Sequence, residues 1–192
     1  MAVREVNTNE VLLHGILAEV EYDYCFNDKE YFKSSVGIKR SAEKWDDIPL
    51  SIPADIVIHP SDDNQFVRIE GEYRSRTVNG EKQKYVLVKD IRFLKDHEPG
   101  CVNEVMVEGY VSCEPYHRIV GKDSVELTQV TLAVNRRGGV AYVPVVGWKE
   151  DALILKDLKK GNKLRCKGRF QSRTIKNGRE LLELSIEELE VL

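Results

Sequence analysis

Apolar and polar residues alternate through the second half of the chain. Because successive side chains of a β-strand point to opposite faces, a run in which every second residue is apolar or glycine predicts a half-buried strand. The sequence therefore predicts five strands in this half. Their alternating positions run over residues 105–109, 130–134, 143–147, 164–166 and 182–186.

One segment breaks this alternation, the stretch KEDALILKDLKKG at residues 149–161. Its apolar residues Ala152, Leu155 and Leu158 recur at every third position, its acidic residues come early, its lysines come late, and a glycine ends it. These features are typical of a short helix with charges that complement its dipole. The sequence predicts this helix between the third and fourth strands.

The first half of the chain repeats the second in outline. The words NEVLLHGIL and SRTVNG are matched in the second half by NEVMVEGYV and SRTIKNG, and Gly71 recurs as Gly168. Collinear matches over such a distance indicate a duplicated domain rather than a solenoid. The expected domains are residues 1–100 and residues 101–192, joined near residues 97–101.

Five strands with one helix between the third and the fourth is the arrangement of the oligonucleotide-binding (OB) barrel. The predicted fold class is therefore all-β, with two tandem OB-fold (five-stranded Greek-key) barrels, each with one short helix between strands 3 and 4. In the first barrel this helix is expected within residues 54–65 and is shortened by Pro60. The two SRT words are expected to mark the hairpin between strands 4 and 5 of each barrel.

The second half resembles the bacterial single-stranded DNA-binding protein (SSB) family in the words NEVMVEGYV, TLAVNRR, YVPVVGWKEDA and LKDLKKGNKLRCKGRFQSR. The resemblance implies an OB barrel in which aromatic residues near the two ends of the third strand stack on DNA bases. In this chain those positions are Tyr142 and Trp148. Strand parity agrees independently, because both residues have the parity opposite to that of the predicted core positions. The alternative is that the two aromatics contact another subunit, since interfaces are rich in both types.

Basic residues surround the two aromatics, and a single strand of nucleic acid needs cations for its phosphates as well as rings for its bases. Four of them alternate with apolar residues and are expected on the outer face of the fourth strand; the alternative is an ordinary solvated face. The family tends to have an aromatic residue just after Arg173, where this chain has Thr174 and Ile175, so one stacking position is not predicted. The predicted nucleic-acid-binding residues are Trp148, Tyr142, Arg136, Arg137, Lys149, Lys163, Arg165, Lys167, Arg169 and Arg173.

The first repeat has a different surface. Asp47 and Pro53 stand where the second repeat has its two aromatics, and Glu70 and Glu72 stand where it has Lys167 and Arg169. Residues 1–102 carry 14 Lys and Arg against 19 Asp and Glu, whereas residues 103–192 carry 15 against 13. The aromatics of the first repeat are expected to build its core and a subunit surface, and the alternative is a displaced nucleic-acid path. Binding is therefore predicted mainly in the second barrel.

The function predicted from these features is sequence-independent binding of single-stranded DNA, with RNA as the alternative ligand, in replication, recombination or repair. A second hypothesis is a primosome-like or scaffold OB module whose main partner is another protein, which the acidic first repeat favours. No P-loop or G-x-S-x-G sequence is present, and the four cysteines form no C-x-x-C pair. The sequence therefore predicts neither an enzyme nor a metal or other cofactor.

Assembly and location are also predicted. SSB relatives commonly work as four OB barrels, so a chain with two barrels is expected to form a homodimer. No apolar run approaches the roughly 18 residues of a membrane span, and the polar start MAVREVNTNE predicts a cytoplasmic protein rather than a secreted one. The last residues, SIEELEVL, continue the fifth strand. We therefore expect no flexible acidic tail that recruits repair and replication enzymes.

Overall fold

The structure is a computed structural model that describes residues 5–56, 65–94, 100–174 and 180–192. The chain forms two compact units, each described here by itself. The N-terminal unit comprises Glu10–Glu104 and Gln171–Leu182; the C-terminal unit comprises Val105–Phe170 with Met1–Asn9 and Glu183–Leu192. The units thus differ from the two predicted halves in three short segments, residues 1–9, 101–104 and 171–182. Of the predicted junction at residues 97–101, residues 97–99 lie outside the described residues.

Hydrogen bonds of backbone N–H groups explain the grouping of the first and the third of these segments. In the C-terminal unit, the N–H of Asn7 donates to the carbonyl of Asn135 (2.9 Å), and Asn7 Oδ1 accepts the N–H of Asn135 (3.0 Å). In the N-terminal unit, the N–H of Ser172 donates to Asp46 Oδ1 (3.0 Å), and Ser172 Oγ accepts the N–H of Asp47 (2.7 Å). Sequence periodicity carries no information about such bonds between distant residues.

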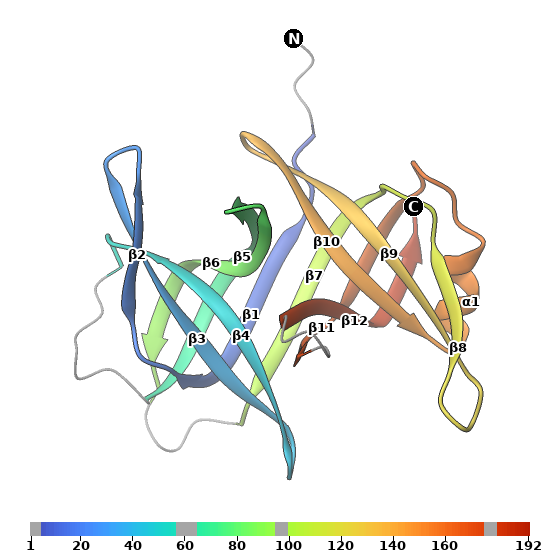
Figure 1. The fold of residues 1–192 in the computed structure, drawn as a ribbon, viewed down its shortest axis with the longest axis horizontal. Coiled ribbons are helices and arrows are strands. Elements are labelled where there is room, and N and C mark those ends of the chain that lie inside the picture. Colours follow the sequence, from blue (N-terminus) through green and yellow to red (C-terminus); the bar gives the residue numbers. More distant parts are fainter. Residues whose placement is uncertain (1–4, 57–64, 95–99, 175–179) are drawn as a thin grey trace. The chain divides into compact units, whose positions relative to one another are not determined.

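Six strands form the N-terminal unit: β1 (Asn9–Leu17), β2 (Glu21–Phe26), β3 (Lys29–Ser41), β4 (Lys44–Pro53), β5 (Phe66–Val78) and β6 (Glu81–Phe93). The strand order is β2-β3-β4-β6-β5-β1, and β1 also pairs with β3, which closes the sheet into a barrel. All these pairs are antiparallel except β4 with β6. Figure 1 draws these strands in blue to green.

The C-terminal unit repeats this plan with β7 (Val102–Val111), β8 (Tyr116–Val120), β9 (Val125–Arg136), β10 (Gly139–Trp148), α1 (Glu150–Lys156), β11 (Lys163–Thr174) and β12 (Glu180–Val191). Its strand order is β7-β11-β12-β10-β9-β8, with β7 also paired to β9 and with β10 parallel to β12. The prediction of two OB barrels in one all-β chain is therefore confirmed. The long β9–β10 hairpin is the orange pair of strands in Figure 1.

The five strands predicted for each barrel are all present, and their apolar positions point inward. Each unit also has a further strand that was not predicted, β2 or β8, which pairs with the strand that follows it. Both lack a clean apolar alternation, because no core covers either of their faces. The fully buried side chains of the two barrels include Leu13, Val36, Ile48, Ile69 and Val86, and Val107, Leu132, Val143, Val145, Leu164 and Leu184.

Helix α1 confirms the short helix that was predicted between the third and fourth strands of the C-terminal barrel. Ala152 and Leu155 are buried on its inner side against β9 and β10, and it ends at Lys156, shortly before Gly161. The helix predicted within residues 54–65 lies largely outside the described residues, which omit 57–64. Nowhere in the part of the chain that the structure describes is a helix long and apolar enough to cross a membrane.

The first SRT word forms the hairpin expected of it. Asn79 and Gly80 have positive φ angles of 51° and 82°, and they connect the paired residues Val78 and Glu81 of β5 and β6. A two-residue Asn-Gly turn with both φ angles positive matches the twist of a β-hairpin. The corresponding turn of the second word, at residues 177–178, lies outside the described residues.

Candidate nucleic-acid interface

Strand β10 places both predicted stacking residues on the outer face of the C-terminal barrel. Val143 and Val145 are fully buried, whereas the side chains of opposite parity at Tyr142 and Trp148 are 42% and 38% exposed. Val146 shares their parity but is buried, so the face is not uniformly open. Six residues of strand separate the two rings by roughly 20 Å. They therefore offer two separate stacking positions rather than one.

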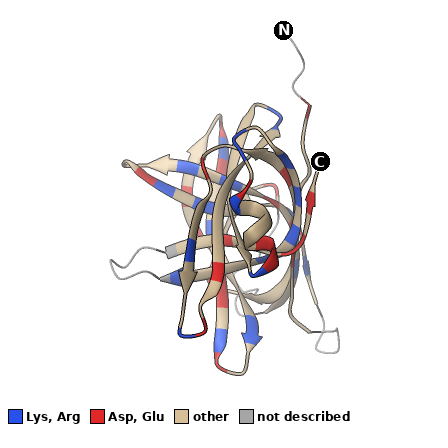
Figure 2. Ribbon diagram, turned by 90° about the vertical axis from the view of Figure 1, so that its right-hand side faces the viewer, with Lys and Arg blue, Asp and Glu red and all other residues tan. Residues whose placement is uncertain are grey.

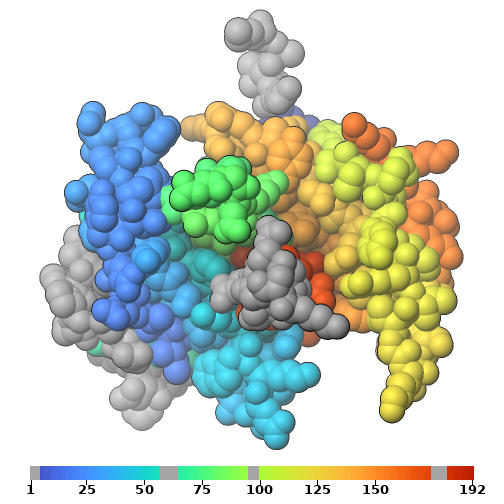
Figure 3. All heavy atoms as spheres, in the orientation of Figure 1, coloured from blue at the N-terminus to red at the C-terminus, as the bar shows by residue number. Residues whose placement is uncertain are grey.

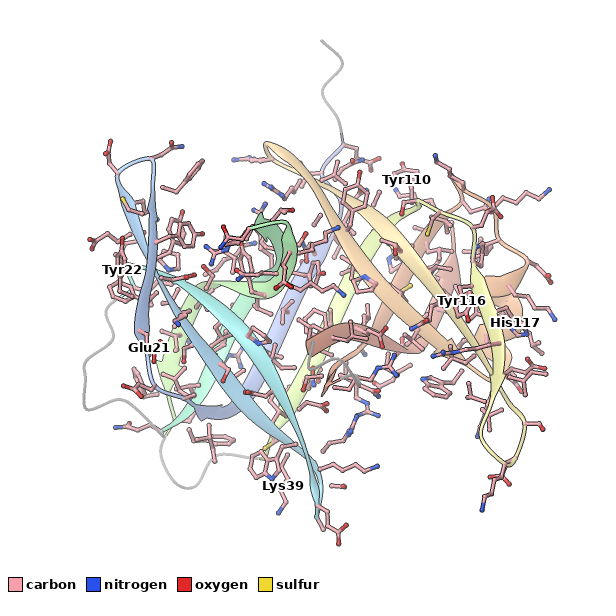
Figure 4. All side chains as sticks on the ribbon, viewed as in Figure 1. Glu21, Tyr22, Lys39, Tyr110, Tyr116 and His117 are labelled. Carbon is pink, nitrogen blue, oxygen red and sulfur yellow. The ribbon has the colours of Figure 1, made fainter. Side chains whose placement is uncertain are left out.

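Strand β8 adds a third ring to the same face. Across the antiparallel pairs, Trp148 lies opposite Leu127 of β9, and Leu127 lies opposite Arg118 of β8, so all three project from one face. Tyr116 has the parity of Arg118 and is 59% exposed. The Arg118 guanidinium carbon lies 5.7 Å from the centroid of the Tyr116 ring, within cation–π range. Figure 4 labels Tyr116 on β8.

The sequence analysis missed Tyr116 and Arg118. The stretch YHRIV offers one signal, because Tyr116, Arg118 and Val120 occupy every second position, as outward-facing residues of a strand do. Gly121, whose φ of 74° belongs to a turn, follows directly. A run of five residues without a core face is too weak a pattern to predict a strand. We call the outer surface of β8, β9 and β10, with the turn at Arg136–Arg137 and with Lys149, the strand-binding face.

Cations on this face differ in their partners. Among the described residues, neither Arg118, Arg137 nor Lys149 forms an ion pair with a carboxylate. Arg137 and Lys149 are exposed, and Arg136 donates through Nη1 to the backbone carbonyl of Arg137 (3.1 Å). A cation without a carboxylate partner keeps its full charge for a phosphate. The turn before β10 and the residue after it therefore add positive charge next to the exposed rings.

The predicted row of four cations does lie on the outer face of β11, alternating with buried Leu164 and Cys166. Each of the four, however, faces a carboxylate of a neighbouring strand, and both signs of charge are spread over the strands in Figure 2. The shortest pairs are Lys163–Glu5 (3.8 Å), Arg165–Glu190 (2.6 Å), Arg165–Glu108 (2.7 Å), Lys167–Glu188 (3.1 Å) and Arg169–Glu187 (3.3 Å).

These pairs balance the charge of the row. The hydrogen bond from Arg165 to Glu108 raises the pKa of the guanidinium above its ordinary value. The carboxylates belong to β7, β12 and residue 5. The sequence of β11 alone therefore does not indicate that its cations are paired. The row is consequently a weaker candidate for phosphate contacts than the unpaired cations at the ends of β10.

A comparison of two double variants tests this ranking. Arg137→Ala with Lys149→Ala is expected to lower the salt slope of single-strand affinity by roughly 1.4, because each phosphate contact contributes about 0.7. Arg165→Ala with Lys167→Ala removes the same formal charge from paired residues and is expected to change the slope by less than half as much. Affinity measured between 50 and 200 mM salt decides between them. A larger slope change in the β11 variant would contradict the ranking.

Arg173, also predicted to bind, lies in the segment 171–182 and so belongs to the N-terminal unit. It is exposed on β11 next to Ser172, whose backbone and hydroxyl are held by Asp46 and Asp47. Arg173 therefore lies outside the unit that contains the strand-binding face.

The N-terminal unit lacks the two stacking residues, as predicted. Asp47 lies opposite Gly37 and Pro53 opposite Tyr31, in the registers that Tyr142 and Trp148 occupy in the other unit. Its aromatics gather elsewhere: the rings of Tyr24 and Tyr31 stack at 4.8 Å between centroids. The Arg76 guanidinium lies 3.9 Å from the Tyr24 centroid and pairs with Asp23.

A groove of about 700 Å³ lies beside this cluster within the N-terminal unit. Burial raises the pKa of Tyr85, which lines it, to about 12, so the phenol stays protonated at physiological pH. The remaining lining is mixed in charge and includes Asp23, Lys33, Asp47, Arg76, Glu81, Lys82, Lys84 and Leu182. No group of three or more His, Cys, Asp or Glu residues that could hold a metal ion occurs within the described ranges.

The sequence matches no protein-family model and no curated protein sequence. The fold, however, is that of the single-stranded DNA binding protein from Thermus aquaticus. The wild-type protein superposes with a TM-score of 0.77 at 19% identity, covering 98% of this chain and 94% of that one. A deletion mutant of it gives a TM-score of 0.78 at 20% identity, covering 97% and 95%. The resemblance stated from the sequence is thus confirmed in the fold over nearly the whole chain.

Proposed function

We propose that this protein binds single-stranded DNA without sequence preference through the strand-binding face of its C-terminal unit. The observation that carries the proposal is the exposure of Tyr142 and Trp148 on one face of β10, together with Tyr116 and Arg118 on β8. Every base has a face that stacks on an aromatic ring, so such a surface holds a strand whatever its sequence.

The chemistry divides between rings and cations. Tyr116, Tyr142 and Trp148 hold bases by stacking, while Arg118, Arg137 and Lys149 neutralise phosphates and release their counterions. The stacking positions on β10 lie roughly 20 Å apart, which requires a strand extended along the face. A rigid duplex does not present its bases in this way, so the arrangement favours a single strand.

The shared fold supports the same proposal. The two Thermus aquaticus structures are of a protein named for binding single-stranded DNA, and they superpose on this chain over both units. We extend that activity to this chain and, with it, a role without catalysis in replication, recombination or repair in the cytoplasm.

A titration with labelled oligonucleotides of mixed sequence tests the proposal. Single-stranded DNA should bind with an affinity that depends little on sequence, and the duplex of the same sequence should bind much more weakly. An RNA strand of equal length is titrated as the third ligand, and its affinity relative to the DNA strand shows which polymer the protein prefers. Equal affinity for single strand and duplex, or binding that requires one sequence, would contradict stacking as the basis of recognition.

A protein partner is the second candidate function, and the N-terminal unit favours it. Asp47 and Pro53 replace the stacking residues there, and the groove beside Arg76 is lined by both signs of charge as well as apolar residues. The net charge of residues 1–102 is −5, which disfavours a polyanion. A single-strand titration separates the two candidates, because a scaffold needs no affinity for DNA.

We further propose that the protein forms a homodimer with four OB barrels. A strand bound without sequence contacts gains affinity by engaging several faces, and linked sites raise the effective concentration at the second contact. Sedimentation at micromolar concentration should then give about twice the chain mass of 22.0 kDa. If the protein is a monomer that still binds single strands tightly, the proposed four-barrel assembly is contradicted and the binding proposal is not.

A further inference from the structure

A hydrogen bond between two side chains crosses the strand-binding face. Gln129 Nε2, on β9, donates to Glu183 Oε1, on β12, over 2.8 Å. An ionised carboxylate only accepts hydrogen bonds, so Gln129 must turn its amide nitrogen toward Glu183. We call these two side chains the Gln129–Glu183 bridge.

Strand pairing fixes where this bridge lies. Gln129 lies opposite Val146 of β10 in the antiparallel register, and Ser185 of β12 lies opposite the same valine in the parallel register. Glu183 has the outward parity of Ser185, whereas its neighbour Leu184 is fully buried. Because β10 lies between β9 and β12, the two side chains must pass over β10 to meet. Val146, which lies beneath the bridge, is accordingly only 5% exposed.

The bridge lies between the two stacking positions. Val146 follows Tyr142 by four residues and precedes Trp148 by two, which places it roughly 13 Å from the first and roughly 7 Å from the second along the strand. The ends of the face are marked in Figure 3 by two turns, that of β9–β10 in orange at the top and that of β8–β9 in yellow at the bottom. A nucleic-acid strand that reaches both rings must therefore pass over the bridge.

Charges are distributed unevenly along this path. Arg137 precedes β10 and Lys149 follows it, so cations flank the strand at both ends. The described outward residues of β9 and β10 between the two rings are uncharged: Gln129, Thr131, Pro144 and Val146. Glu183 brings a carboxylate to this middle part. Because like charges repel, phosphates are favoured at the two ends and base edges over the bridge.

Base edges differ in what they offer to a carboxylate. Cytosine and adenine have an exocyclic amino group that donates, and glutamate accepts from cytosine N4 in protein–DNA complexes. Thymine and uracil have the acceptor O4 in that place, and their N3–H lies between two carbonyl groups that a carboxylate repels. A carboxylate has about four acceptor positions, so the hydrogen bond from Gln129 leaves Glu183 able to accept from a base as well.

We propose that the Gln129–Glu183 bridge contacts the base that passes over it and favours bases with an exocyclic amino group over thymine and uracil. Glu183 accepts from the amino group, and Gln129 is a positioning residue that holds the carboxylate over β10. This inference rests on the proposed function and names the bases preferred at one point of the same face. Only one base of the bound strand is affected at each face, so binding still requires no particular sequence.

Oligodeoxycytidylate and oligodeoxyuridylate of equal length test this preference, because their bases differ only at position 4 and the adjoining N3. The wild type should bind the cytidylate more tightly. Glu183→Gln should lower the affinity ratio of the two ligands by roughly two- to tenfold, the range of one hydrogen bond, because glutamine both donates and accepts and so suits either base. Gln129→Ala keeps the charge but releases the carboxylate from its position, and should lower the ratio part of the way.

Glu188→Gln is the matched control. It makes the same chemical change on the same strand, at a residue that pairs with Lys167 outside the strand-binding face, and should keep the wild-type ratio. Tight binding of both ligands with an unchanged ratio in Glu183→Gln contradicts this inference alone. A ratio that falls equally in Glu188→Gln also overturns it, because the effect is then one of general charge. If neither ligand binds, the proposed function is contradicted, and this inference with it.

Discussion

Trp148→Ala is expected to weaken single-strand binding by at least roughly fivefold, because one base–aromatic stack contributes about 1–3 kcal/mol. Trp148 is more than a third exposed, at 38%, and packs across from Leu127 on the strand-binding face, so its removal leaves the barrel core untouched. Tyr142→Ala should have an effect of the same size. Because the two rings lie roughly 20 Å apart, the two losses should be nearly additive in free energy.

The chain offers a matched control in its other tryptophan. Trp45 lies on β4 of the N-terminal unit and is 49% exposed, so Trp45→Ala removes a similar ring from outside the strand-binding face. Its single-strand affinity should equal that of the wild type. Trp148→Phe keeps a smaller ring at the site and should bind with intermediate affinity. Equal losses in Trp45→Ala and Trp148→Ala would mean that neither ring marks the site.

Gly168→Ala is expected to have the second large effect, on stability rather than on binding. A Cβ atom at this position would collide with the backbone carbonyl of Ser185 in β12. Gly71, its counterpart in the repeat, would place a Cβ 2.6 Å from the carbonyl oxygen of Leu87 in β6. Backbone cannot give way as a flexible side chain can, so each alanine should lower the free energy of unfolding by about 1–3 kcal/mol or more.

Chemical unfolding of three variants measures this effect. Gly100→Ala is the control, because no atom of the described residues lies within 4 Å of a Cβ there. Its unfolding midpoint should match the wild type, whereas Gly71→Ala and Gly168→Ala should unfold at clearly lower denaturant concentration. Wild-type stability in Gly168→Ala would mean that β11 and β12 do not approach each other as closely as described.

The repeated glycines illustrate what the sequence is able to predict. Glycine was matched between the repeats at 71 and 168, and the close approach of two backbones explains why the same residue type occupies both positions. The alternation around Leu132 and Val145 likewise predicted barrel strands, because a single buried face imposes a period of two. Such features are local, so they can be recognised in the sequence of one strand without knowing which strands pair with it.

The cation row on β11 illustrates what the sequence does not contain. Lys167 and Arg169 alternate with buried residues as predicted, yet their partners Glu188 and Glu187 come from a strand whose register is set only by folding. Strand β8 was missed for a related reason, since an edge strand without a core face leaves no apolar period. The stacking residues were predictable because parity alone places them outward, whereas the charge around them depends on pairing.

Fluorescence of Trp148 tests the central claim most directly. The chain has two tryptophans, so Trp45→Phe leaves Trp148 as the sole indole, and its emission then reports on one point of the strand-binding face. Addition of a single-stranded oligothymidylate should quench this emission in proportion to the bound fraction measured by anisotropy, because a base stacks on the ring. Saturable binding by anisotropy with no change in the Trp148 emission would contradict stacking at this face.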